Sequence, residues 1–459
     1  MTPPDEVDVV VVGSSLEGLL LATELERAGR RVVLLEQRQS LGGRYRVESE
    51  SGFTFGTGIH LARYGAHGSL GEMLFRQEDA GSLRELGRSY VVMDGRIYVL
   101  PLGVRALFQT RLLGLREQAR AVRMLFALRS WADPFGQTEK DLDGWMDVQG
   151  IGEGLARVLR LAAGSMTMRA DPGALAAGEV LEALRRAVDL GVVMSYPSDG
   201  WGNVVRSAGQ RFTEAGGRLM IGAAVRSVDV EEGAVVGVTE AGGRRWSAPE
   251  VVWAADPARL KGVVEELGPD TRRAMECVRP VRAVGLSLGL ERPVSATTGL
   301  WYLDDPGAWV FFPSNLARSL APPEGQLLEA VIPLAEGDAS HELVARLEEQ
   351  LGGVFSGLSS HVVARRTLVL ERLHGTDVGS DATRIQRPPI ALGTPRGLFL
   401  VGDTVAAPGL GPEVGFGAVR RALQRMLGSQ AELEPPEVAQ SSEAGEALKV
   451  GRRSRPSGD

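Results

Sequence analysis

Residues 7–44 constrain the fold more than any other part of the chain. They read VDVVVVGSSLEGLLLATELERAGRRVVLLEQRQSLGGR, an apolar run (residues 7–12), a helix-like segment (16–27) and a second apolar run (31–35). Continuous runs of β-branched and aliphatic residues are typical of strands buried on both faces of a parallel sheet. The stretch therefore predicts a β-α-β unit, in which Gly29 ends the helix.

The turn before the helix has the spacing of a dinucleotide-binding loop. Its sequence, Gly13-Ser14-Ser15-Leu16-Glu17-Gly18, follows the pattern G-x-G-x-x-G except that Ser15 replaces the second glycine. Glycine here lets the backbone approach a pyrophosphate, which the free N–H groups and the dipole of the helix N-terminus attract. Glu36, 23 positions after Gly13, is placed to accept hydrogen bonds from an adenosine ribose. Ser15 takes up space and Glu17 adds negative charge, so the loop alone is weak evidence.

A second glycine loop, Leu41-Gly42-Gly43-Arg44, follows soon after Glu36. The run LLEQRQSLGGR after a β-α-β unit resembles the glutathione-reductase-type flavoproteins of the amine oxidase and phytoene desaturase group. The resemblance implies that FAD is the cofactor, that Glu36 holds its ribose, and that Gly43 and Arg44 lie beside the phosphates. Gln37, next to Glu36, is a further cofactor-binding candidate. An NAD-binding unit without flavin is the alternative. The first turn adds these cofactor-binding candidates: Gly13, Ser15, Leu16 and Gly18.

Two later segments extend the resemblance. Residues 196–257 contain the family's succession of YP, G, GG and V, followed by a strand that ends in AADP, and this implies that Val225 contacts the adenine through its backbone. Residues 397–428 predict a strand, a glycine-rich loop and a helix from about Val414. The resemblance implies that Asp403 bonds the ribityl chain and that the backbone from Gly411 to Val414 meets the pyrimidine edge of the flavin. Gly402 is a further cofactor-binding candidate. A helix N-terminus at that edge stabilises negative charge on reduced flavin.

The segment GFTFGTGIHLARYG (residues 52–65) resembles the part of the family that passes beneath the flavin ring. Its glycines permit close backbone approach, and Gly58 is a further cofactor-binding candidate. His60, Arg63 and Tyr64 are the candidates for catalysis, because their polar side chains could face the ring or the substrate. The alternative for His60 is that it only satisfies a loop carbonyl.

The resemblance implies an α/β fold (α+β overall). It comprises a discontinuous, glutathione-reductase-type FAD-binding Rossmann domain with an inserted substrate domain of helices on an antiparallel sheet. The turn signal Asp94-Gly95 predicts a hairpin, and residues 101–190 are predicted to be largely helical. The predicted FAD-binding domain comprises residues 1–69, 191–282 and 390–428, and the predicted substrate domain comprises residues 70–190 and 283–389. Residues 429–459 are predicted to be a disordered tail.

Composition excludes several classes of protein. Apolar residues make up 44% and charged residues 24%, as in ordinary globular proteins, and the net charge of −7 argues against nucleic-acid binding. Cys277 is the single cysteine and the five histidines are scattered, so no metal site is predicted. Acidic residues precede the first apolar run and no apolar stretch is long enough to span a bilayer, so we expect a cytoplasmic protein.

Residues 104–131 differ from the rest of this acidic chain. Glu117 is their only acidic residue, while arginines recur among aliphatic and aromatic residues at positions 105, 111, 116, 120, 123 and 129. A basic amphipathic stretch of this kind predicts peripheral contact with an anionic membrane surface. The alternative is a pair of helices packed on their own domain, with the arginines in solvent.

The predicted function is that of an FAD-dependent oxidoreductase similar to phytoene desaturases. It transfers a hydride from a small hydrophobic substrate, isoprenoid or carotenoid in type, to flavin N5, and the flavin supplies the redox chemistry. No second unit for NAD(P)H is evident, so electrons leave to oxygen, a quinone or another diffusible acceptor. One alternative is a flavin amine oxidase-like enzyme. The other is a non-redox lipid-binding protein similar to Rab GDP-dissociation inhibitors, and it is retained because Ser15 and Glu17 depart from the usual dinucleotide-binding loop.

Overall fold

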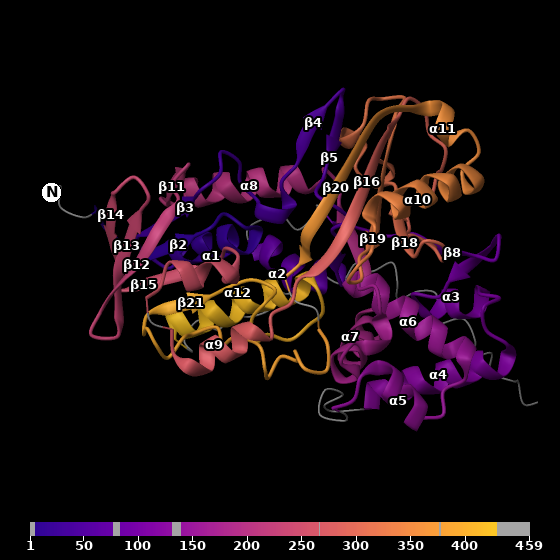
Figure 1. The fold of residues 1–459 in the computed structure, drawn as a ribbon, viewed down its shortest axis with the longest axis horizontal. Coiled ribbons are helices and arrows are strands. Elements are labelled where there is room, and N and C mark those ends of the chain that lie inside the picture. Colours follow the sequence, from indigo (N-terminus) through magenta and orange to yellow (C-terminus); the bar gives the residue numbers. More distant parts are fainter. Residues whose placement is uncertain (1–4, 77–82, 131–138, 266, 376–377, 429–459) are drawn as a thin grey trace, which may run out of the picture.

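The computed structural model describes residues 5–76, 83–130, 139–265, 267–375 and 378–428 (Figure 1). The predicted tail, residues 429–459, lies outside the described residues. The first layer of the fold is a parallel sheet. Its strands follow the order β11 (Arg218–Ile221), β3 (Val32–Glu36), β2 (Val9–Val12), β15 (Glu250–Trp253) and β21 (Leu398–Leu400).

Packing on both faces explains the unbroken apolar runs of the central strands, because helices cover one face and strand β13 (Ala234–Glu240) of a second sheet packs against β15. All residues of β2 and β3 are buried. Helix α1 (Leu16–Arg27) packs against both α8 (Trp201–Glu214) and α12 (Pro412–Leu427), and Figure 1 shows α9 (Pro269–Glu276) near α12. The predicted β-α-β unit and the α/β fold class are therefore confirmed.

The first strand is shorter than predicted, because residues 5–8 have other partners. Strand β1 (Asp5–Glu6) pairs with β14 in a second sheet, and the backbone N–H of Arg31 donates to the Asp8 carboxylate at 2.8 Å. This second sheet lies at the left of Figure 1. Its strands follow the order β1, β14 (Arg245–Ser247), β13 (Ala234–Glu240) and β12 (Val225–Glu231).

A seven-stranded sheet forms the other half of the molecule. It is antiparallel as predicted, except that β17 and β8 run parallel. Helices α10 (Ser340–Val354) and α11 (Leu358–His361) pack on its outer face. The strand order is β20 (Val362–His374), β16 (Val281–Leu290), β19 (Gln326–Pro333), β18 (Ala308–Phe311), β17 (Trp301–Leu303), β8 (Ser89–Met93) and β9 (Arg96–Leu100).

Five helices lie below this sheet in Figure 1 and form a separate apolar core. They are α3 (Val104–Gln109), α4 (Leu115–Ser130), α5 (Leu142–Val148), α6 (Glu153–Thr167) and α7 (Ala177–Leu190). Within the described ranges, no helix is both long and apolar enough to cross a bilayer.

Short elements connect the two halves. Strand β10 (Met194–Pro197) pairs with β6 (Ala62–Arg63) and β7 (Leu83–Glu85), and β4 (Glu48–Glu50) forms a hairpin with β5 (Phe53–Phe55). Helix α2 (Ser69–Arg76) packs against α12. Residues 45–67 therefore run from the parallel sheet toward the seven-stranded sheet and the helices below it.

Candidate dinucleotide site

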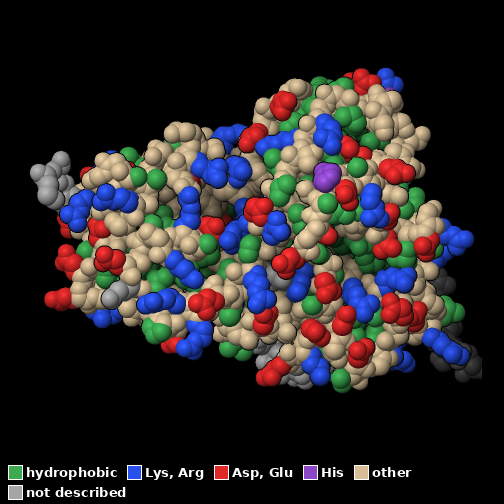
Figure 2. Space-filling model, in the orientation of Figure 1, with side chains coloured by type: hydrophobic (Ala, Val, Ile, Leu, Met, Phe, Trp, Pro, Cys, Tyr) green, Lys and Arg blue, Asp and Glu red, His purple; other side chains and the backbone are tan. Residues whose placement is uncertain are grey.

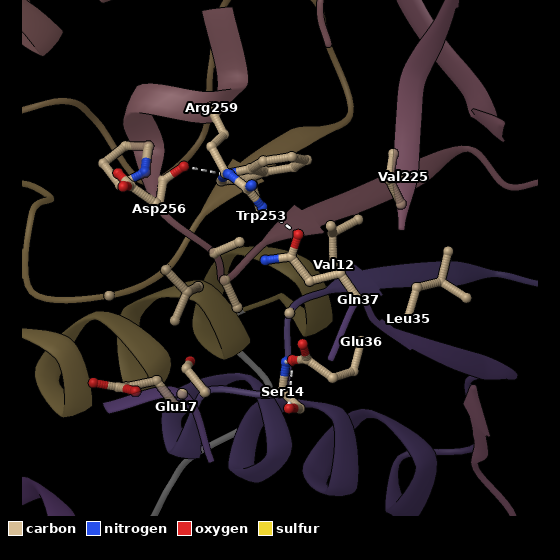
Figure 3. Close-up of a pocket in the computed structure, with 18 of the residues that line it drawn as sticks. Val12, Ser14, Glu17, Leu35, Glu36, Gln37, Val225, Trp253, Asp256 and Arg259 are labelled. Carbon is tan, nitrogen blue, oxygen red and sulfur yellow. Dashed lines mark hydrogen bonds between the residues drawn. The ribbon is translucent and has the colours of Figure 1, made fainter. Parts of the chain in front are cut away.

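A cavity of about 660 Å³ lies at the carboxyl ends of β2, β3 and β15 and beside the loop after β21 (Figure 3). This edge is where open α/β sheets bind their ligands. The three segments that resembled a flavoprotein in sequence meet here. Of the candidates predicted from sequence, these residues line the cavity: Gly13, Ser15, Glu36, Gln37, Gly43, Arg44, Val225, Gly402 and Asp403.

Ser15 is compatible with the tight turn because its side chain caps the helix. It is the N-cap of α1, and its hydroxyl accepts a hydrogen bond from the backbone N–H of Gly18 at 3.2 Å. Gly13 has φ +101°, which favours glycine, and a Cβ on Gly18 would lie 2.5 Å from the Gly13 carbonyl oxygen. The two outer glycines are therefore required by geometry, while the middle position accepts a capping serine.

Glu36 is fixed by the turn that it faces. One carboxylate oxygen accepts from the Ser14 backbone N–H at 2.9 Å and from the Ser14 hydroxyl at 2.6 Å, and the other accepts from the Arg38 N–H at 2.8 Å. Figure 3 shows the carboxylate beside Ser14 at the floor of the cavity. The acid at the end of the second strand is thus held rigidly where the sequence placed a ribose acceptor.

Arg44, which is predicted to lie beside the phosphates, is 3.9 Å from Glu17, and Glu17 lines the cavity. A Cβ on Gly415 would lie 2.6 Å from its Oε1 atom, and Figure 3 shows its carboxylate directed away from Glu36. Burial raises the pKa of Glu17, and Arg44, 3.9 Å away, partly offsets that effect. Neither Ser15 nor Glu17 fills the crevice.

Arg44 links the first and last segments of the site. Its Nη1 atom donates to Asp403 at 2.6 Å, and Asp403 also accepts from the Gly375 N–H at 2.7 Å. Burial alone would raise the pKa of Asp403, but Arg44 and these hydrogen bonds hold it below its ordinary value of 3.8. The inner end of the cavity therefore carries a charged, hydrogen-bonded pair.

The wall of the cavity also contains residues that the sequence did not single out. Arg259, in the 3₁₀ helix Pro257–Gly262, donates to Gln37 (Figure 3), and Arg372 pairs with Asp256 at 3.0 Å. Trp253, at the end of β15, also lines the cavity. No local motif marks these positions, because each pair joins segments that are distant in the sequence.

Some predicted candidates lie outside the cavity lining. Leu16 and Val414 are fully buried, Gly18 packs in the turn, and Gly411 is the N-cap of α12. Helix α12 begins at Pro412 and not at Val414, because proline suits the first helical position. Gly58 lines a second cavity of about 10 Å³ together with His60 and Glu329.

The three catalytic candidates do not converge. Tyr64 has φ +59° and its hydroxyl donates to the Ala183 carbonyl in α7 at 3.2 Å, so it points away from the cavity. Arg63 donates to the carbonyls of Ser165 at 3.1 Å and Met166 at 2.6 Å. Burial lowers the pKa of His60 to about 3, so its imidazole is neutral. A buried histidine that the sequence did not single out, His374, ends β20 nearby.

A doubly covered parallel sheet with a glycine turn at a helix N-terminus and an acid ending the second strand defines a dinucleotide-binding protein. The position of the last segment, which contributes Asp403 to the same cavity, extends the site toward the second half of the molecule. Residues 18–437 match the model of the family described as flavin containing amine oxidoreductase. The chain belongs to this family and is an FAD-dependent oxidoreductase.

Relatives and solved structures agree with this assignment. The chain is 41% identical over 80 residues to an all-trans-retinol 13,14-reductase of Macaca fascicularis (17% of this chain, 13% of the relative). It is 51% identical over 49 residues to a lycopene-forming phytoene desaturase of Pseudescherichia vulneris (11% and 10%). The matches thus span a small part of each relative. An oxidoreductase from Methanosarcina mazei has a similar fold, with a TM-score of 0.74, 19% identity and coverage of 91% of this chain and 100% of that one.

The residues present fit FAD. The cavity is continuous from Val225 to Asp403, and a Cβ on Gly402 (φ +139°) would meet no other atom within 4 Å, so the backbone there is open to a ligand. Beyond Asp403, both ring nitrogens of buried His374 lack a hydrogen-bond partner within the described residues. Across that same part of the chain, no group of three His, Cys, Asp or Glu side chains could hold a metal ion.

Proposed function

We propose that this enzyme oxidises a small hydrophobic substrate of the isoprenoid type, with hydride transfer from a substrate C–H bond to flavin N5. The observation that carries the substrate class is the pair of partial relatives, whose names specify retinol and phytoene, two isoprenoid polyenes. The direction of hydride transfer is supported by the desaturase alone, since the retinol relative is named a reductase. The predicted binding roles of the cavity-lining residues are part of this proposal. Glu36 would hold the ribose, Val225 the adenine, and Asp403 the ribityl chain.

The inner face of the seven-stranded sheet supports an apolar substrate. On β19 and β18, Leu327, Val331 and Phe311 belong to the core that the sheet shares with the FAD-binding half, and Glu329 is the one carboxylate between them. Removing hydride from a hydrocarbon depends on positioning over the ring more than on an acid-base pair. The apolar inner face of the sheet, which has no acid and base directed at one point, suits that chemistry.

The test is anaerobic reduction of the purified yellow protein, followed by flavin absorbance. We expect phytoene-like polyenes in detergent to bleach the oxidised flavin, and primary amines or polyamines to leave it unchanged. Bleaching by amines alone would overturn the proposal in favour of an amine oxidase-like activity. If polyenes reoxidise the prereduced protein and do not bleach the oxidised one, hydride passes from the flavin to the substrate, which is the reverse of the proposed direction.

We propose further that α3 and α4 rest on an anionic lipid surface. Three large apolar side chains are exposed there: Phe108 (62%), Leu115 (85%) and Phe126 (68%). Leu115 and Phe126 lie 11 residues apart in one helix, which places them on the same face after three turns. Such a strip, bordered by cations, is the arrangement of an interfacial helix.

The charges around this strip favour anionic lipid. Arginines 105, 111, 116 and 123 are exposed, while Glu117 turns inward and accepts from the backbone N–H groups of Gly114 and Leu155. On the face shown in Figure 2, basic and acidic side chains are interspersed, so no field of a single sign covers it.

Vesicle flotation tests this surface. We expect flotation with phosphatidylglycerol vesicles, little with phosphatidylcholine, and loss of flotation in Phe126→Asp combined with Leu115→Ser. Ile385→Asp is the matched control, because Ile385 is also exposed (78%) but lies in another segment. Equal flotation of all three proteins would refute the assignment of α4 as the contact.

A further inference from the structure

Arg63 and His374 are two buried side chains whose nitrogens are incompletely hydrogen bonded. Each is less than 5% exposed. Within the described residues, Nε and Nη1 of Arg63 and both ring nitrogens of His374 have no hydrogen-bond partner. Buried polar groups in native proteins are nearly always hydrogen bonded, so this concentration of nitrogens without a partner indicates a ligand.

These two side chains flank the N-terminus of α12. Nη2 of Arg63 donates to the Met166 carbonyl at 2.6 Å. A Cβ on Gly411, the N-cap of α12, would lie 2.9 Å from that same carbonyl oxygen and 3.9 Å from the His374 ring. The first N–H groups of a helix have no partner within the helix, and the helix dipole makes this end positive.

The neighbouring acids do not balance the charge of Arg63. Oε1 of Glu413 accepts from the Ser69 N–H and hydroxyl and pairs with Arg186 at 2.9 Å, while its buried Oε2 atom has no hydrogen-bond partner within the described residues and Glu413 raises the pKa of Arg63 only through its charge. Among the described residues, no carboxylate lies within 4.0 Å of Arg63. Burial lowers the pKa of Arg63 to about 10, so it remains a cation at neutral pH. A buried cation of this kind requires an electron-rich partner.

The cluster adjoins the inner end of the dinucleotide cavity. His374 precedes Gly375, whose N–H donates to Asp403, a residue that lines the cavity. Burial lowers the pKa of His374 to about 3, so the imidazole is neutral and offers one N–H donor. Arg63 and His374 lie outside the lining of the cavity, and a ligand that reached past Asp403 would meet a cation, a neutral donor and a helix N-terminus.

We propose that Arg63 and His374 bind the pyrimidine half of FAD and stabilise the negative charge that it carries after reduction. The inference rests on the proposed hydride transfer and deepens it. A hydride brings two electrons and one proton to N5, and the resulting negative charge lies on the pyrimidine half of the ring system. Arg63 and His374 are thus assigned to cofactor binding, as residues that set the reduction potential.

The experiment measures the reduction potential of the FAD-loaded protein by equilibration with a reference dye. We expect Arg63→Met to favour oxidised FAD at least tenfold, a shift of about 30 mV toward negative potential for a two-electron couple. His374→Leu should shift it in the same direction by a smaller amount. Arg63→Lys and His374→Gln, which keep a donor, should restore most of the loss. The affinity for oxidised FAD should change less than threefold, because the charge appears only on reduction.

Two matched controls replace residues far from the cluster. Arg206→Met and His361→Leu remove a surface arginine and a histidine paired with Glu291, and both should leave the potential unchanged. Unaltered potentials in Arg63→Met and His374→Leu protein that binds FAD would overturn the inference. If Arg63→Met fails to fold, the comparison of His374→Leu with His374→Gln decides it. A normal flavin potential without substrate oxidation would instead count against the proposed substrate.

Discussion

Glu329 gives the sharpest prediction of pH-dependent stability. It lies on the inner face of β19, is 4% exposed, and accepts one hydrogen bond, at 3.0 Å, from the Gly56 N–H. Burial raises its pKa to about 7 from an ordinary value of 4.5, against the smaller opposing effects of Gly56 and Arg366. The folded protein therefore binds a proton at Glu329 more tightly than the unfolded chain does.

The sign and size of the effect follow from that difference. The stabilisation is fully present below about pH 4.5 and is lost as the pH rises through 7, because the folded state then gives up a tightly held proton. The difference between the two pKa values corresponds to about 3 kcal/mol. Glu329→Gln keeps the acceptor for Gly56 and is neutral at every pH. We expect the variant to match the wild type at pH 5 and to be more stable by about 3 kcal/mol at pH 8.5.

Guanidinium unfolding of the FAD-saturated proteins at the two pH values measures this difference. Glu371→Gln is the control, since Glu371 is exposed and paired with Arg282, and its effect should vary little between the two pH values. A Glu329→Gln variant with the same change in free energy of unfolding at pH 5 and pH 8.5 would refute the reasoning.

Three further predictions concern the cavity. Ser15→Ala should lower the free energy of unfolding by about 1 kcal/mol and Ser15→Gly by only a few tenths, because the hydroxyl caps α1; equal losses in thermal unfolding would contradict the capping role. Glu36→Ala should weaken FAD binding at least tenfold in a fluorescence titration, and unchanged affinity would refute the ribose assignment. Asp403→Asn should cost about 3 kcal/mol of stability, since it leaves Arg44 without its nearest anion; a loss below about 1 kcal/mol in the same assay would show that the pair is not tightly coupled.

The sequence predicted the parts of the fold that depend on local pattern. The apolar run of β2 and the helix α1 were predictable because the apolar pattern of their buried residues lies within one short stretch of sequence. The start of β2 was not, because the Asp8 carboxylate is fixed by the backbone of Arg31, which no local pattern reveals. The parallel contact of β17 with β8 likewise depends on strands more than 200 residues apart.

The candidate site divides in the same way. Gly13, Ser15 and Glu36 belong to one contiguous motif with fixed spacing, and they line one cavity. Arg259 and His374 went unrecognised because their surroundings come from distant segments, and a single arginine or histidine carries no local signal. Tyr64 was selected for its neighbours in sequence, but a left-handed backbone turn directs it toward α7.

The pairing of Arg44 with Asp403 has a consequence for biosynthesis. These residues lie 359 positions apart, so the inner wall of the pocket forms only after residues up to Asp403 have been synthesised. The first β-α-β unit is complete by Glu36, whereas a chain that lacks β21 and the following loop lacks the side of the cavity that contains Asp403. Such a chain would leave Arg44 without its carboxylate partner.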